Sequence, residues 1–271
     1  MANQRILVMD SVTKLDAKDH GKVLVAASHG GVYAGYLAAK GHARGVILND
    51  AGGGLDGAGY GALEWADAFG MPAAVVDCRS ARIGDGQDTM RRGVISRVNA
   101  AALRAGVTVG VPAAAAAARL STIPLWQGAP PELPESRFVI MATADAPTVI
   151  GCDSASLIRD EDAGQIVVCG SHGGLLANAP GYIVKAPLLG VVLNDAGIGK
   201  DNAGVARVYA AEDMGIAAAA VAAASARIGD ARSTWETGVL SAVNALAARV
   251  GAVPGMTVQA FVAALIAQVT R

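Results

Sequence analysis

Histidine and aspartate lie in two short strings that each occur twice in this chain of 271 residues. Ser-His-Gly-Gly contains His29 and His172, and Asn-Asp-Ala-Gly contains Asp50 and Asp195. An imidazole can transfer a proton or donate a hydrogen bond to an oxyanion, and a neighbouring carboxylate can orient it. We therefore predict that these four residues are catalytic, with each aspartate orienting the histidine of its own copy. A structural role is the alternative, because aspartate also caps helices and stabilises turns.

Cys78 is a further catalytic candidate because only one copy contains it, and the other copy has Ala223 at that place. As a thiolate beside His29 it would be a nucleophile. A lone cysteine after a hydrophobic segment also fills small buried spaces, so both interpretations stay open. The other cysteines, Cys152 and Cys169, form no CxxC pair with it, which argues against a disulfide framework or a structural zinc site.

An anionic substrate could be held by arginine side chains or by backbone N–H groups. Each copy has an arginine in the string Ser-Ala-Arg-Ile-Gly-Asp, and glycines follow the aspartate of the other string. Glycine lets a ligand approach main-chain N–H groups, although a tight turn requires glycine equally, and the arginines can instead pair with carboxylates. The predicted substrate-binding residues are Ser28, Gly30, Asn49, Gly52, Gly54, Ser80, Arg82, Ser171, Asn194, Lys200 and Arg227.

The repeated strings follow one another in the same order, which predicts two copies of one folding unit. VLVAASHGG, GVILNDAGGG and SARIGD in the first half correspond to IVVCGSHGG, GVVLNDAGIG and SARIGD in the second. The segment 120–137 between them is rich in proline and is predicted to be a linker. We therefore predict a first α/β unit over 1–119 and a second over 138–271.

Short aliphatic segments alternate with helical patterns, which is typical of an α/β fold. The predicted strands of the first copy are 5–10, 22–28, 45–50 and 73–77, and its predicted helices are 32–39, 61–69 and about 87–105. The strands are almost continuously hydrophobic, as expected of parallel strands covered on both faces. We predict two tandem homologous units, each a doubly wound, Rossmann-like parallel sheet of three layers, related by pseudo-twofold symmetry.

Ligands bind such sheets at the carboxyl ends of the strands, where the strand order reverses. The polar loops that follow 22–28, 45–50 and 73–77 are therefore expected to converge on one edge. The sequence of strand, His-Gly, strand, polar turn, helix and strand over 23–85 and in the second copy resembles the caspase-like peptidase fold. Where that family has its nucleophilic cysteine, this chain has Asp50-Ala51, so the resemblance does not extend to peptidase activity.

Two cofactor sites are alternatives to chemistry without a cofactor. GGGLDG at 52–57, with Asp77 farther along, has the spacing of a dinucleotide-binding turn and its ribose-binding acid, which would indicate NAD(P) or FAD. The second copy has Asn202 in place of the third glycine and Ala222 in place of the acid. A divalent metal could be held by the two histidines and two aspartates of the repeated strings, if they meet across the pseudo-twofold axis.

The composition argues against several kinds of partner. Twenty-two Lys and Arg residues stand against 23 Asp and Glu residues, and clustered basic residues that would bind nucleic acid are not evident. Only 17% of the residues are charged, which predicts a homo-oligomer, and the chain has no apolar run of about 18 residues that would span a membrane. The segment 5–10 is predicted to be a strand and not part of a signal peptide, so a cytoplasmic location is expected.

Together these features predict a cofactor-independent hydrolase or lyase that acts on a small polar, anionic metabolite. Two alternatives remain: a non-catalytic ligand-binding or scaffold protein, and an NAD(P)- or FAD-dependent oxidoreductase that uses GGGLDG.

Overall fold

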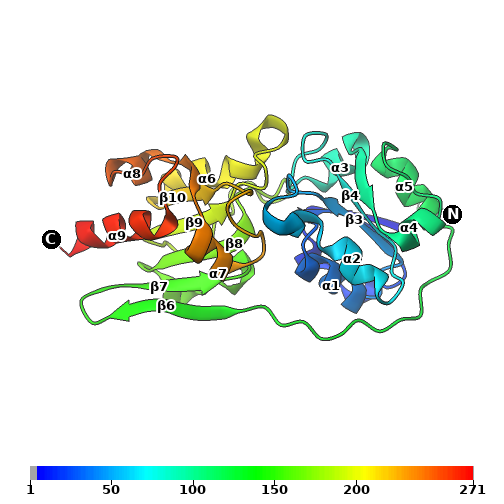
Figure 1. The fold of residues 1–271 in the computed structure, drawn as a ribbon, viewed down its shortest axis with the longest axis horizontal. Coiled ribbons are helices and arrows are strands. Elements are labelled where there is room, and N and C mark those ends of the chain that lie inside the picture. The colour runs from blue at the N-terminus through cyan, green and yellow to red at the C-terminus, as the bar shows by residue number, and fades with distance from the viewer. Residues whose placement is uncertain (1–4, 271) are drawn as a thin grey trace.

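The computed structural model describes residues 5–270. Residues 1–4 of the first predicted unit and residue 271 of the second lie outside the described residues. The chain forms an α/β fold with two mixed β-sheets and covering helices (Figure 1). None of the described helices is both long and apolar enough to cross a membrane.

The first sheet has five strands whose order across the sheet follows their order in the chain. These strands are β1 (Ile6–Met9), β2 (Val23–His29), β3 (Gly45–Asn49), β4 (Ala73–Val76) and β5 (Ile95–Val98). The first four are parallel, and β5 is antiparallel to β4. The strand order does not reverse anywhere within this sheet, which differs from the predicted doubly wound order, and the carboxyl ends of β2, β3 and β4 are adjacent because the strands are consecutive and parallel.

Helices cover both faces of the first sheet because successive side chains of its strands point to opposite sides. The helices are α1 (Val32–Lys40), α2 (Ala62–Asp67), α3 (Gly86–Arg92), α4 (Ala100–Arg104) and α5 (Ala113–Leu120). Leu24 and Leu48 pack with α1 and α2 on one face. Val25 and Ile47 pack with α3, α4 and α5 on the other. This burial on both faces accounts for the continuous hydrophobicity of the strands.

The second sheet has six strands in consecutive order. These strands are β6 (Arg137–Thr143), β7 (Ala146–Cys152), β8 (Ile166–His172), β9 (Gly190–Asn194), β10 (Ala217–Val221) and β11 (Leu240–Val243). The four central strands are parallel, and the two outer strands are antiparallel to their neighbours. Its helices are α6 (Ala206–Ala210), α7 (Ala231–Thr237), α8 (Ala245–Arg249) and α9 (Val258–Val269).

The structure corrects two predictions about the first half. The sheets are mixed and not wholly parallel. The helix predicted over about 87–105 is α3, then β5, then α4, because Gly93 follows the last turn of α3 and the β-branched residues Val94, Ile95 and Val98 favour a strand. Asn99 then starts α4, where its side chain accepts a hydrogen bond from the Ala102 N–H.

The proline-rich segment 121–136 runs between α5 and β6 without helix or strand, and Figure 1 shows it as the long green connection beside the first sheet. Side chains attach it to the first half. Trp126 Nε1 donates a hydrogen bond of 2.7 Å to Ala43 O, and Tyr36 Oη donates one of 2.5 Å to Glu132. The last residues of this segment reach the cleft described below.

Candidate functional site

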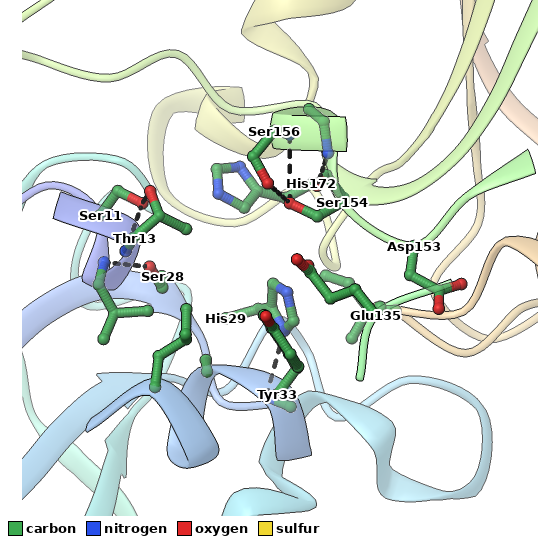
Figure 2. Close-up of a pocket in the computed structure, with 18 of the residues that line it drawn as sticks. Ser11, Thr13, Ser28, His29, Tyr33, Glu135, Asp153, Ser154, Ser156 and His172 are labelled. Carbon is green, nitrogen blue, oxygen red and sulfur yellow. Dashed lines mark hydrogen bonds between the residues drawn. The ribbon is translucent and has the colours of Figure 1, made fainter. Parts of the chain in front are cut away.

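A cleft of about 970 Å³ lies between the two halves, beside the carboxyl ends of β2 and β8 (Figure 2). Both repeated Ser-His-Gly-Gly strings contribute to its lining, through Ser28, His29, Ser171 and His172. The cleft therefore joins the two strings in one site.

His29 and His172 face each other at the ends of β2 and β8, with ring centroids 6.3 Å apart and rings nearly perpendicular. Each ring is held by the backbone two residues later. The N–H of Gly31 donates to His29 Nδ1 at 3.1 Å, and the N–H of Gly174 donates to His172 Nδ1 at 3.1 Å. A Cβ atom at Gly31 would lie only 2.7 Å from His29 Nδ1, so the second glycine of the string lets the backbone lie close against the ring.

Both imidazoles are neutral near pH 7. Burial lowers the pKa of His29 to about 4, and burial together with the nearby charge of Arg207 lowers the pKa of His172 well below its usual value. A neutral imidazole carries one proton, and because Nδ1 accepts a hydrogen bond in each ring, we assign that proton to Nε2. The pair therefore presents two N–H donors, which suits stabilisation of an oxyanion better than proton abstraction.

Hydroxyl groups line the cleft in matching pairs from the two halves. Ser28 Oγ accepts a hydrogen bond of 3.0 Å from the backbone N–H of Val12, and Ser171 Oγ accepts one of 2.9 Å from Ala155. Further hydroxyl pairs are Ser11 with Thr13 at 2.8 Å and Ser154 with Ser156 at 2.7 Å. These groups add uncharged hydrogen-bonding atoms to the cleft.

Glu135 is a cleft residue that the sequence did not indicate, because it lies in the proline-rich segment. Figure 2 shows its carboxyl group pointing into the cleft between Tyr33 and Ser154. Burial raises the pKa of Glu135 above its usual value, and burial together with the Glu135 charge raises the pKa of Tyr33 to about 12. A carboxyl with a raised pKa in a cleft is suited to take up and release a proton.

Asp50 and Asp195 do not orient the histidines, contrary to expectation. Asp50 accepts hydrogen bonds from the N–H groups of Gly52 and Cys78, both at 3.0 Å, and from Ser96 Oγ at 2.8 Å. Asp195 accepts from two backbone N–H groups in the same way, at 2.8 and 2.9 Å. Each carboxylate stabilises the loop that follows its strand, which is the structural alternative for these residues.

Cys78 and the predicted metal ligands also lie apart from the histidine pair. Cys78 is buried and does not line the cleft, and burial together with the Asp50 carboxylate raises the pKa of its thiol to about 12. Its Sγ lies within 4.8 Å of oxygens of Asp50 and Asp77, but hydrogen bonds already engage both carboxylates. The cleft thus brings together two imidazoles without the two aspartates expected to complete a metal site.

The glycine-rich loops after β3 and β9 pack against each other across the two halves. A Cβ atom at Gly52 would lie 2.8 Å from the Cα of Gly197. The backbone N–H of Leu55 donates to Ala223 O at 2.8 Å, and the N–H of Lys200 donates to Cys78 O at 2.8 Å. GGGLDG therefore engages protein backbone at the position where a dinucleotide-binding turn would engage pyrophosphate.

Replacing Gly52 by alanine is expected to destabilise the fold far more than the same change at Gly70. Both glycines have positive φ, +71° and +80°, and alanine in this conformation costs roughly 1–2 kcal/mol. No other atom lies within 4 Å of a Cβ at Gly70, whereas at Gly52 the Gly197 backbone must move, which costs about 1–3 kcal/mol more. Urea unfolding of both variants measures the difference, and equal destabilisation would contradict the close packing of the loops.

The predicted substrate cations form ion pairs between the halves. Arg82 pairs with Asp201 at 2.5 Å, and Arg227, which lines the cleft, pairs with Asp56 at 2.5 Å. Lys200 Nζ donates to Ser80 O at 3.2 Å. These cations therefore link the two halves. This is the structural alternative that the sequence left open for the arginines.

The remaining predicted substrate-binding residues shape loops. Asn49 and Asn194 are fully buried, and their side chains bond to the backbone of the following loops. Ser80 Oγ donates to Asp77 O at 2.7 Å, and the Gly30 N–H donates to Asn49 O at 2.7 Å. A Cβ atom at Gly54 would lie 3.0 Å from Ala223 O.

Arg207, in α6, is a second cleft residue absent from the predicted set. A difference between the two copies indicates Arg207 in the sequence, because the first copy has Ala62 at the corresponding place.

Comparison of the chain with protein-family models, with curated proteins and with solved structures finds no match.

Proposed function

We propose that the chain is a cofactor-independent hydrolase or lyase that acts on a small polar, anionic molecule bound in the cleft. The observation that carries this proposal is the facing pair of neutral histidines, each with Nδ1 held by a glycine N–H and Nε2 left to donate. Two such donors can hold the negative charge that develops on a carbonyl oxygen, which both reaction classes require.

Glu135 supplies the proton transfers in this proposal. In hydrolysis it takes a proton from water while the water oxygen bonds to the carbonyl carbon, and the C=O electron pair moves onto the oxygen held by the histidines. The electron pair on that oxygen then re-forms the C=O bond, and the leaving atom departs with its bonding electrons and takes the proton from Glu135. In a lyase reaction Glu135 takes the proton of a β-hydroxyl group, and the O–H electrons form a new C=O bond while the bond between the α and β carbons breaks. The electrons of the broken bond form an enolate whose negative oxygen the histidines hold, and Glu135 then returns its proton to the α carbon.

A panel of small amides, esters and oxo or hydroxy acids, followed by proton NMR without added metal or nucleotide, tests the proposal. The wild type is expected to convert at least one compound, and asparagine at His29 or His172 is expected to abolish most of that conversion. No conversion across the panel, or equal conversion by the histidine variants, would contradict the proposal. Heat stabilisation by a panel member without conversion would instead indicate a ligand-binding protein.

We further propose that the two halves are homologous α/β units, over 1–119 and 138–271, joined by the linker 120–137. The equal strand order of the central strands and the matching bonds at His29 and His172 support this. A cytoplasmic homo-oligomer that binds a small molecule and no nucleic acid remains our proposal for its partners and location, supported by a charged fraction of only 17%.

A further inference from the structure

Arg207 is a buried cation in the wall of the cleft. Its residue is only 5% exposed, and its guanidinium makes one hydrogen bond, from Nη2 to Gly174 O at 2.8 Å. Within residues 5–270, its Nε has no hydrogen-bond partner and none of the ion pairs includes Arg207. Arginine stays ionised in proteins and offers five N–H donors, so a buried guanidinium without a counter-charge is unfavourable until an anion joins it.

The backbone fixes Arg207 beside one histidine of the pair. The N–H of Arg207 donates to Gly173 O at 2.7 Å, and its guanidinium donates to Gly174, whose N–H holds His172 Nδ1. In the first half, the N–H of Ala62 donates to Gly30 O at 2.9 Å in the same manner, but alanine supplies no charge. Among the described residues, the cleft therefore has paired donors from both halves, and Arg207 adds a buried cation without an ion-pair partner on the side of the second half.

We infer that Arg207 binds a carboxylate of the substrate, so that the substrate is a small carboxylic acid whose reacting carbonyl meets the two histidines. This inference rests on the proposed function and adds the chemical class and the orientation of the substrate. The planar guanidinium matches a carboxylate through two parallel N–H···O bonds. Because only one side of the cleft carries this cation, the acid binds in one direction although the histidines are paired.

The charges that line the cleft favour a carboxylate over a phosphate group. Glu135, Asp153 and Asp230 also belong to the lining, so a phosphate with two negative charges would meet more repulsion there than a carboxylate with one. The other arginines there are engaged, because Arg227 pairs with Asp56 and Arg232 lies 4.1 Å over the Phe138 ring. One buried guanidinium balances the single charge of a carboxylate.

Thermal unfolding with acetate, acetamide and inorganic phosphate tests the inference without relying on turnover. Saturating acetate is expected to raise the melting temperature of the wild type by roughly 3 °C or more over sodium chloride of equal ionic strength, whereas neutral acetamide and phosphate give little shift. Arg207→Met is expected to lose the acetate shift. The matched variant Arg232→Met removes another arginine of the cleft and is expected to keep it.

An equal acetate shift in Arg207→Met and wild type, or a larger shift with phosphate than with acetate, would overturn the inference. NMR of the arginine Nε–H groups in the wild type is a second measurement of acetate binding. It does not require that Arg207→Met folds. The signal that disappears in Arg207→Lys is expected to move saturably with acetate and not with acetamide, and an unmoved signal would also overturn the inference. If the histidine variants lose turnover while the Arg207 signal does not change with acetate, the proposed function stands and this inference fails. If the histidine variants keep turnover while acetate binds at Arg207, the proposed function fails and the carboxylate site at Arg207 stands.

Discussion

Asparagine in place of His29 is expected to lower kcat/KM by roughly 10²–10³-fold on the substrate identified in the panel, with little change in melting temperature. The asparagine Oδ1 occupies nearly the position of Nδ1 and can accept the hydrogen bond that Gly31 now donates to the ring. The variant therefore keeps the loop in place and deletes only the Nε2–H donor. His172→Asn is expected to behave alike, because Gly174 donates to its ring in the same way.

Two further variants separate this role from a structural one. Glutamine at position 29 places its amide nitrogen near the position of Nε2, so His29→Gln is expected to keep more activity than His29→Asn. His20 is exposed and outside the cleft lining, and His20→Asn is expected to leave kcat/KM unchanged. A large fall in melting temperature with parallel losses in the asparagine and glutamine variants would show that the histidine serves the fold.

Glutamine in place of Glu135 is expected to lower kcat by roughly 10²–10⁴-fold, the usual contribution of a positioned acid–base group. The change keeps the size of the side chain and removes its ability to take a proton. Because burial raises the pKa of Glu135, the wild-type rate is expected to fall as the pH falls through a value above that of an ordinary glutamate, where the base becomes protonated. Glu135→Gln is expected to lose this acidic limb of the pH–rate profile.

Glu132 gives a matched control on the same segment. Its carboxylate is exposed and accepts a hydrogen bond from Tyr36, outside the cleft lining. Glu132→Gln is expected to keep both the rate and the acidic limb. An unchanged pH–rate profile in Glu135→Gln would remove Glu135 from the proposed reaction.

The strands that end at the histidines could be predicted from sequence because their hydrophobicity is continuous and the Ser-His-Gly-Gly string follows at once. The structure has Val23–His29 where 22–28 was predicted. The strand Ile95–Val98 was missed because it is short and lies between two helices. Its hydrophobic residues were therefore assigned to one continuous helical pattern. Its pairing with β4 is a tertiary contact that a local pattern does not show.

The candidate site was only partly predictable for a related reason. Repetition within the chain identified His29 and His172, but it equally selected residues that hold the two halves together, such as Asp50 and Gly52. Glu135 lies in the cleft because the segment between α5 and β6 passes beside it. That segment has no helix or strand, so a hydrophobic pattern in the sequence does not predict where its side chains lie. Differences between the copies were a better guide to charge in the cleft than their agreement, as Arg207 opposite Ala62 shows.

The central claim is that two neutral histidines present Nε2–H donors to one cleft, and ¹⁵N NMR of the histidine rings tests it without a known substrate. His29→Asn and His172→Asn assign the two signal sets. We expect both rings to be neutral with the proton on Nε2 from pH 8 down to pH 5, because the pKa of His29 is about 4 and that of His172 is also well below its usual value. A proton on Nδ1 of either ring, or a charged ring at pH 6, would contradict the claim.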